Sequence, residues 1–284
     1  DFVPRETHKL VECGLAVSLV AVNQADALPE PLRDSGLPTW SDVQACGLPQ
    51  EPPQLEQAGD GLACIIYTSG TTGNPKGVMI SHGNLMANVR SILAALPIQP
   101  GDRFLNVLPF YYSYGNSVLH THLVQGATLY LENSMMFPNV VVSRMAQEKI
   151  TGFAGVPSTF SLLLSRGKVA EHDLSSLRYV LQAGGAMPVP VIQQVLEHLS
   201  SHVYVMYGQT EATARLTWLP PEQLLEKLGS VGVPIAGVEI QIRHPDGSEC
   251  GPEEDGELFV QGANVALGYW RNPEATAATF IDGW

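Results

Sequence analysis

The sequence predicts an α/β fold in which parallel sheets are flanked by helices and are followed by a small antiparallel β subdomain. Between residues 104 and 206, short apolar stretches with strand character alternate with stretches at helical spacing. Repeated βα units of this kind form a parallel sheet with right-handed crossovers and helices on both faces. After Gly229, apolar residues alternate with polar ones around a Pro-Asp-Gly turn, which is typical of antiparallel strands.

The expected elements follow in chain order. A strand over 15–22 precedes an irregular connection over 23–60 that is rich in Pro, Gly, Asp and Glu. The apolar run 62–66 predicts a buried strand, 78–80 a short strand, and the apolar spacing over 85–96 a helix that Ser81 caps. In the alternating region we expect strands over 104–108, 128–131, 152–156, 177–181 and 203–206, and helices over 116–124, 140–148, 158–164 and 189–199.

These elements predict three parts. Residues 1–96 would form the end of a first α/β subdomain with a phosphate loop, residues 97–228 a second α/β subdomain, and residues 229–284 the β-rich subdomain. In parallel sheets, ligands bind beyond the carboxyl ends of the strands. The loops that follow the strands are therefore the places to search for function.

Composition narrows the class of protein. The chain has 284 residues and a net charge of −13, and it lacks a basic stripe of the kind that binds nucleic acid. A nucleotide stays possible, because surface carboxylates beyond about 8 Å are screened at physiological salt. No apolar run reaches the roughly 18 residues of a membrane-spanning helix. The first residues lack both an initiator Met and the features of a signal peptide, so we expect the chain to start within a longer protein.

The four cysteines predict a reducing compartment. Cys13, Cys46, Cys64 and Cys250 lie far apart in the sequence. Their spacing argues against both a structural zinc site and a disulfide framework. A cytoplasmic protein fits this pattern best.

The stretch YTSGTTGNPKG at residues 67–77 has the composition of a polyphosphate-binding loop. Glycines let the backbone approach an anion, hydroxyl groups add donors, and Lys76 supplies a positive charge. A flexible surface turn is the alternative, since the same residue types form turns. Neither the Gly-Lys-Ser/Thr spelling of a P-loop nor a G-x-G-x-x-G after a strand is present.

Three further loops carry residues suited to ligand binding. Residues 182–188 leave a slot of bare backbone for a planar base, or simply form a tight turn into the next helix. In the second loop, Tyr207 could stack on a base, Thr210 could donate to a phosphate and Glu211 could hold Mg²⁺. The alternative for Glu211 is that it caps the start of a helix. The aromatic loop 109–115 would suit the wall of a mostly apolar pocket, although core packing explains at least one of its tyrosines equally well.

Together, YTSGTTGNPKG, YGQTE and GELFVQGANVALGYWRNPEATAATF resemble the adenylate-forming superfamily of acyl-CoA synthetases, luciferases and nonribosomal peptide adenylation domains. The resemblance runs from about Leu62 to Trp284. It implies that Glu211 holds Mg²⁺, that Lys76, Thr210 and Glu211 serve catalysis, and that Tyr207 stacks on adenine. The other residues implied for ATP are Thr68, Ser69, Gly70, Thr71, Thr72 and Gly73 at the β- and γ-phosphates and Gly184, Gly185 and Ala186 at the adenine slot. The substrate pocket would include Tyr111, Tyr112, Ser113, Val156 and Ala183.

The family reaction would be attack of a substrate carboxylate on the α-phosphorus of ATP, followed by transfer of the acyl group to a thiol. That thiol belongs to coenzyme A or to the phosphopantetheine of an acyl carrier protein. The alternatives are an amino-acid adenylation module and a nucleotide-binding remnant without catalysis. We expect an incomplete catalytic core, because members of the family continue into a ribose-binding Asp and a mobile C-terminal lid domain that are absent from this sequence.

Some residues depart from the family pattern. Many acyl-CoA synthetases carry His where Tyr112 stands. Amino-acid-activating members place an Asp in the aromatic loop, and residues 109–115 contain no carboxylate, which favours a plain organic acid. Arg215 could bind a second anion on the substrate, although a solvated or salt-bridged arginine is the more expected outcome.

Overall fold

In a computed structural model of the chain, residues 59–68 and 75–284 are described, and they belong to one compact unit, Gln57–Trp284. The strand expected over 15–22 and most of the connection over 23–60 lie outside the described residues. Among the helices of the described part, none is long and apolar enough to cross a membrane.

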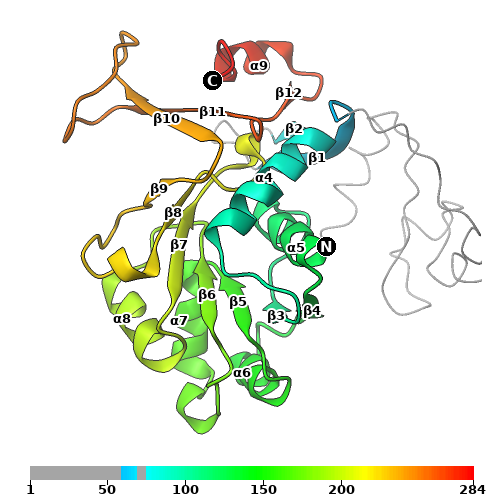
Figure 1. Cartoon of the computed structure of the whole chain (residues 1–284), viewed down its shortest axis with the longest axis vertical. Coiled ribbons are helices and arrows are strands. Elements are labelled where there is room, and N and C mark those ends of the chain that lie inside the picture. The colour runs from blue at the N-terminus through cyan, green and yellow to red at the C-terminus, as the bar shows by residue number, and fades with distance from the viewer. Residues whose placement is uncertain (1–58, 69–74) are drawn as a thin grey trace, which may run out of the picture. The chain divides into compact units, whose positions relative to one another are not determined.

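The centre of the unit is a seven-stranded sheet with the order β4-β3-β5-β6-β7-β8-β9 (Figure 1). The strands from β4 to β7 are parallel, as expected, whereas β8 and β9 are added antiparallel at one edge. The bounds are β3 Arg103–Asn106, β4 Thr128–Leu131, β5 Gly152–Gly155, β6 Tyr179–Gln182, β7 Val203–Tyr207, β8 Thr217–Leu219 and β9 Val233–Pro234.

Helices cover both faces of the sheet, because neighbouring residues of each parallel strand point to opposite sides. In β3, Phe104 packs with α4 and α5, while Leu105 packs with α6, α7 and α8. The bounds are α4 His82–Ala95, α5 Ser113–Gln125, α6 Pro138–Gln147, α7 Pro157–Arg166 and α8 Val189–His198. The five predicted helices are therefore confirmed, and Ser81 caps α4 as expected, accepting from the Asn84 amide at 3.0 Å.

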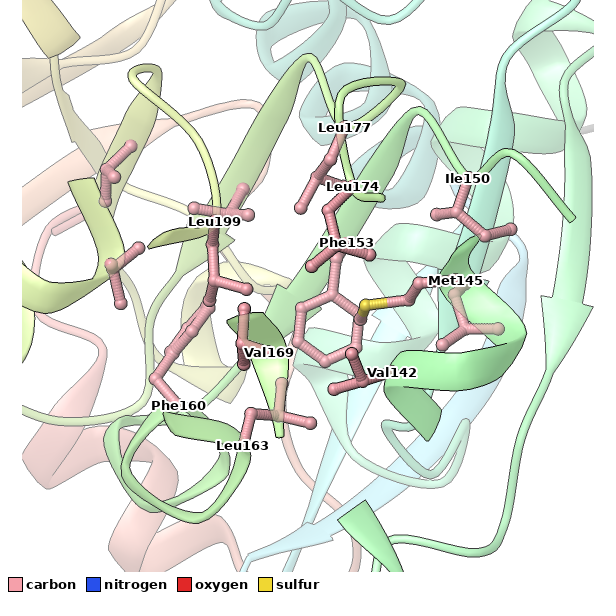
Figure 2. Packing of buried hydrophobic residues seen from close by; sticks show 14 of the residues in the cluster. Val142, Met145, Ile150, Phe153, Phe160, Leu163, Val169, Leu174, Leu177 and Leu199 are labelled. Atoms are coloured by element: carbon pink, nitrogen blue, oxygen red, sulfur yellow. The ribbon is translucent and has the colours of Figure 1, made fainter. Parts of the chain in front are cut away.

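The larger hydrophobic cluster lies between the sheet and α6, α7 and α8 (Figure 2). Phe153 of β5 and Phe160 of α7 meet edge to face at 5.9 Å, and both are fully buried. Burying one side chain of this size is worth about 1.5–3 kcal/mol. This cluster holds the strands in place beneath the loops at their carboxyl ends.

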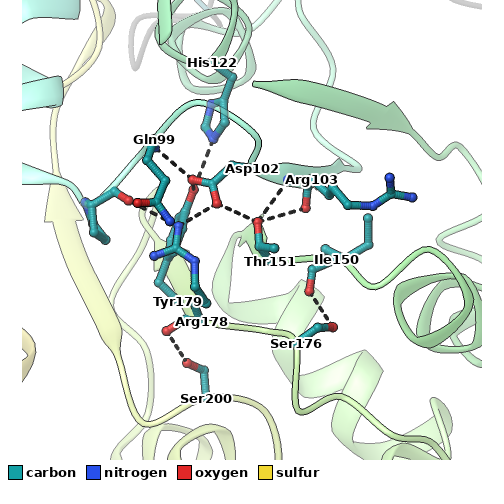
Figure 3. Close-up of polar contacts among 11 residues, drawn as sticks. Gln99, Asp102, Arg103, His122, Ile150, Thr151, Ser176, Arg178, Tyr179 and Ser200 are labelled. Atoms are coloured by element: carbon teal, nitrogen blue, oxygen red, sulfur yellow. Dashed lines mark hydrogen bonds and ion pairs between the residues drawn. The ribbon is translucent and has the colours of Figure 1, made fainter. Parts of the chain in front are cut away.

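A buried polar network crosses the opposite end of the strands (Figure 3). Asp102 accepts hydrogen bonds from Thr151 at 2.8 Å and from the Gln99 amide at 3.0 Å, and it pairs with Arg178. Burial raises the pKa of Asp102, but the bonds from Arg178, Gln99 and Thr151 outweigh burial and hold the pKa below its usual value. The network thus ties the starts of β3, β5 and β6 together.

A second sheet has the order β1-β2-β12 and is antiparallel throughout. Its strands are β1 Leu62–Thr68, β2 Lys76–Ser81 and β12 Gly268–Tyr269. The expectation that residues 62–66 form a buried strand is wrong for most of that run: Ile66 is buried, whereas Leu62 is 36% exposed. The physical reason is that β1 is an edge strand that pairs with β2 alone.

The C-terminal region forms the predicted antiparallel pair, β10 Val238–Arg243 with β11 Glu257–Gly262, and ends in the short helix α9 Pro273–Thr279. Two further strands of the same region belong to other sheets. The strand β9 joins the main sheet, and β12 joins the sheet of β1 and β2. The division of the chain into three subdomains stays a prediction.

Candidate functional site

The two stems of the predicted phosphate loop are adjacent residues of a hairpin. Thr68 ends β1, Lys76 begins β2, and the two are directly paired across the strands. Of the predicted loop residues, Ser69, Gly70, Thr71, Thr72 and Gly73 lie outside the described residues. A Cβ on Gly77 would lie 2.8 Å from Ile65 Cγ2 and 3.2 Å from the Tyr67 ring, so a larger residue there would have to displace these side chains. The stems therefore fix where the loop begins and ends.

The YGQTE segment forms a tight turn at the carboxyl end of β7. Tyr207 is the last residue of β7, and Thr210 and Glu211 lie in the short 3-10 helix η2, Thr210–Ala212. Thr213 (φ 65°) and Ala214 (φ 149°) then adopt left-handed backbone conformations, which cost about 1–3 kcal/mol each. A Cβ on Gly208 would lie 1.6 Å from the Ala214 carbonyl oxygen. Strain of this kind gathers at functional sites.

Tyr269 links the turn to the phosphate-loop hairpin. Its hydroxyl donates to Glu211 Oε1 at 2.8 Å, and the Lys76 ammonium lies 5.0 Å from the centre of its ring. Burial, and then the hydrogen bond to Glu211, raise the pKa of Tyr269 to about 12. Tyr269 therefore stays protonated and donates to the carboxylate at neutral pH.

The aromatic loop meets the same turn from the other side. Ser113 Oγ lies 3.1 Å from Thr210 Oγ1. A residue predicted to line the substrate pocket therefore touches the residue predicted to bind a phosphate. Tyr111 and Tyr112 are 59% and 51% exposed, and their rings are 4.6 Å apart. Tyr114 is the tyrosine that packs inward, and its hydroxyl donates to the Leu181 carbonyl at 2.9 Å.

The glycine loop after β6 lies against the loop after β5. Gly184 has φ 81°, and a Cβ there would meet Val156 Cγ1 at 3.0 Å. Ala183 is buried, whereas Gly184, Gly185 and Ala186 are exposed. The backbone over 184–186 is therefore exposed, as a slot for a flat base would require.

Arg215 departs from its expected place. It is only 2% exposed, so the expectation of a solvated arginine is wrong. It forms no salt bridge with any of the described residues. Its guanidinium lies 4.0 Å from the centre of the Tyr114 ring, and its Nε is buried without a hydrogen-bond partner. Leaving a buried charge without a counter-ion costs several kcal/mol.

The arrangement fits a magnesium nucleotide. Glu211 is a single half-buried carboxylate with one oxygen bonded to Tyr269, and Mg²⁺ binds through one or two carboxylates together with substrate phosphates. The group of potential metal ligands found among residues 59–68 and 75–284 is a different one: His244, Cys250 and Glu254, whose ligand atoms lie within 4.8 Å of one another. Lys76, whose ammonium lies 5.0 Å from the centre of the Tyr269 ring, supplies a positive charge near this carboxylate's hydrogen-bond partner.

Sequence reasoning did not find Tyr269 or the contact between Ser113 and Thr210. The signal for Tyr269 was its place in the GYW segment, which carries part of the family resemblance. Two asparagines hold the stretch over 263–265, which leads into that segment. Asn84 donates to the carbonyls of Ala263 and Val265, each at 2.8 Å, and Asn264 donates to the Ala212 carbonyl at 3.0 Å.

Comparisons with known proteins show which family the chain resembles. A family model described as AMP-binding enzyme matches residues 4–270. The chain is 34% identical to a feruloyl-CoA synthase from Amycolatopsis sp over 284 residues, which cover 99% of this chain and 57% of that protein. It is 39% identical to a 2-succinylbenzoate–CoA ligase from Bacillus pumilus over 223 residues, covering 78% of this chain and 44% of that protein.

Solved structures with a similar fold include a CoA synthetase. O-succinylbenzoate coenzyme A synthetase from Bacillus subtilis, in complex with ATP and magnesium ion, matches with a TM-score of 0.81 and 30% identity, covering 99% of this chain and 57% of that chain. The inhibitor-bound N-terminal domain of FACL13 from Mycobacterium tuberculosis matches with a TM-score of 0.81 and 26% identity, covering 87% of this chain and 62% of that chain. The matches of this chain thus cover between 44% and 62% of the length of these relatives. The family match over most of its residues, together with the fold, shows that it belongs to the AMP-binding enzyme family.

Proposed function

We propose that this chain is the catalytic core of an enzyme that activates a carboxylic acid with ATP and Mg²⁺ and passes the acyl group to the thiol of coenzyme A. The observation that carries the proposal is the meeting of Lys76, Tyr269 and Glu211 between the phosphate-loop hairpin and the η2 turn. The names of the relatives support the reaction, since those proteins are CoA ligases and synthetases.

In the first step a carboxylate oxygen of the acid attacks the α-phosphorus of ATP. The bond from the α-phosphorus to the oxygen that bridges it to the β-phosphate breaks, and pyrophosphate leaves with the bond electrons. Thr68 and Lys76, with Ser69, Gly70, Thr71, Thr72 and Gly73, would hold the β- and γ-phosphates. Positioning and stabilisation of the developing charge supply most of the rate in phosphoryl transfer.

We assign the remaining predicted residues the following roles. Tyr207 would stack on adenine beside Gly184, Gly185 and Ala186, Thr210 would contact the α-phosphate and Glu211 would hold the metal. The acyl group would lie among Tyr111, Tyr112, Ser113, Val156 and Ala183. A carrier-protein phosphopantetheine is the alternative acceptor, and the cytoplasm is the proposed compartment.

The test is the thermal shift that ATP and Mg²⁺ produce in the chain. A ligand at one hundred times its Kd stabilises a protein by about 2.7 kcal/mol. We expect Lys76→Ala and Glu211→Gln each to reduce this shift. The matched controls are Lys149→Ala and Glu197→Gln, which change exposed side chains elsewhere. Unchanged thermal shifts in both site variants would show that Lys76 and Glu211 do not bind the magnesium nucleotide.

Turnover is measured on the longest natural protein that contains this sequence. We expect exchange of radiolabelled pyrophosphate into ATP that depends on both the acid and Mg²⁺. A protein that binds ATP but exchanges with no acid would support the remnant without catalysis, and exchange with amino acids alone would support the adenylation module.

A further inference from the structure

The starting observation is the charge of Arg215, which is buried and has no counter-ion among the described residues. A guanidinium offers five N–H donors and stays protonated in proteins. The contacts of Arg215 use few of them well: one terminal nitrogen lies 3.4 Å from the Met206 sulfur, a weak acceptor, the Tyr114 hydroxyl is a neutral partner, and Nε has no partner. The stacked Tyr114 ring is neutral at ordinary pH, since burial raises the pKa of its hydroxyl.

The position of Arg215 places it next to the proposed acyl pocket. It stacks on Tyr114, the residue after Ser113 in α5, and Ser113 contacts Thr210. The Tyr114 hydroxyl reaches the carbonyls of Leu181 at 2.9 Å and of Gly155 at 3.5 Å. Val156 directly follows Gly155, and it is one of the predicted pocket residues. Arg215 and Tyr114 therefore lie at the carboxyl ends of β5, β6 and β7.

The backbone at Arg215 is held in an unusual conformation. Thr213 and Ala214, which lead into Arg215, both adopt left-handed conformations. Asn88 Nδ2 donates to the Arg215 carbonyl at 2.9 Å, which fixes the backbone at this point. An apolar side chain could fill the same space without burying a charge, and such replacements are often neutral or stabilising. Packing alone therefore does not account for an arginine here.

We propose that Arg215 binds a second anionic group of the acid substrate, so that the substrates are acids with two anionic groups, such as dicarboxylic acids. This inference rests on the proposed function and names its substrate class. A carboxylate can accept two parallel N–H bonds from Nε and one terminal nitrogen of a guanidinium, and Nε is the donor without a partner. The second carboxylate would be held there while the first attacks the α-phosphorus. The same cation would disfavour a substrate with a positively charged amine.

The first test uses the unmodified full-length protein and pairs of acids matched in length. Pyrophosphate exchange is compared for hexanoic and adipic acids and for benzoic and isophthalic acids. We expect kcat/KM to be at least about tenfold higher for the diacid of the preferred pair. Equal or higher values for the monocarboxylic acids would overturn the assignment and leave the ligase function standing. Absence of exchange with every acid would overturn the proposed function and this inference with it.

The second test changes the cation. Arg215→Met is expected to remove the preference for the diacid and to raise exchange with the monocarboxylic acid, whereas Arg215→Lys should retain part of the preference. The control is Arg144→Met, which removes a partly exposed arginine paired with Glu132. Thermal unfolding without substrate separates the roles: a substrate-binding Arg215 predicts an unchanged or raised Tm in Arg215→Met. A lower Tm with an unchanged acid preference would show that the arginine serves the fold alone.

Discussion

The hydroxyl of Tyr269 donates a hydrogen bond to the Glu211 carboxylate at 2.8 Å, although the two residues are 58 positions apart in the sequence. The bond joins the strand β12 to the η2 turn. It also holds the carboxylate that we propose as the magnesium ligand in one orientation. Partners that orient a metal ligand in this way often matter as much as the ligand itself.

Removing this hydroxyl tests its role. We expect Tyr269→Phe to raise the Mg²⁺ concentration that gives half of the ATP-dependent thermal shift by about tenfold, because the carboxylate loses the bond that orients it. Tyr130→Phe is the control, since its ring packs on Arg103 outside the site. The same Mg²⁺ dependence in Tyr269→Phe and in the unmodified chain would contradict an orienting role.

The contact between Ser113 and Thr210 predicts energetic coupling. A typical hydrogen bond contributes about 1 kcal/mol to stability, so Ser113→Ala and Thr210→Val should each lower the free energy of unfolding in urea. The double variant should lose about 0.5–1.5 kcal/mol less stability than the sum of the losses in the two single variants. Additive losses would show that the two hydroxyl groups do not interact in solution.

The close approach of Gly208 to Ala214 predicts a severe effect of one methyl group. A Cβ there would overlap the Ala214 carbonyl oxygen, a backbone atom that cannot move without displacing the chain that follows the η2 turn. We expect Gly208→Ala to lower the free energy of unfolding by about 3 kcal/mol or more.

Gly185→Ala is the matched control for that substitution. The nearest atom to its Cβ would be Pro157 Cγ at 3.4 Å, an ordinary contact. We expect a change in stability within about 1 kcal/mol but a smaller thermal shift with ATP, because the methyl group would enter the proposed adenine slot. Equal loss of stability in both glycine variants would contradict this account of the turn.

His122 predicts a dependence of stability on pH. Burial lowers its pKa to about 4, whereas an exposed histidine titrates near 6.5. Below about pH 6.5 the unfolded chain therefore binds a proton that the folded chain refuses, and stability falls as the pH drops toward 4. The total loss is on the order of 3 kcal/mol at about 1.4 kcal/mol per pH unit.

The measurement is the free energy of unfolding in urea between pH 7.5 and pH 4.5. His122→Gln should be less stable than the unmodified chain at pH 7.5, since it loses the ring contact with Phe104 at 4.0 Å. The gap should narrow toward pH 4.5, because glutamine does not titrate. Some slope will remain, since burial also lowers the pKa of His120. An identical pH dependence in His122→Gln and in the exposed-site control His198→Gln would show that folding does not lower the pKa of His122.

The α/β elements were predictable because their apolar residues repeat at helical or strand spacing, and that spacing depends only on which face of each element is buried. The helix α5 begins at Ser113, three residues before the predicted start at 116. The prediction missed this first turn because the residues over 113–115 are not apolar at helical spacing. The edge position of β1 was not predictable from its apolar run, since it depends on which strands pair with β2.

Within the site, the sequence indicated the residue types but not the contacts between distant segments. The bond from Tyr269 to Glu211 requires β12 to lie beside β2, a pairing that no local pattern encodes. The burial of Arg215 was likewise not indicated locally, and the two residues before it, Thr213 and Ala214, are both left-handed. Neither is a glycine or an asparagine, the residues that usually mark such conformations.

The pairing of β12 with β2 also sets an order of events during synthesis. The hairpin of β1 and β2 leaves the ribosome long before Tyr269, and a two-stranded hairpin is at best marginally stable alone. Until Gly268 and Tyr269 add the third strand, β2 keeps a row of unpaired backbone groups on one side. Stable formation of the phosphate-loop stems is therefore a late step, coupled to the arrival of the C-terminal segment.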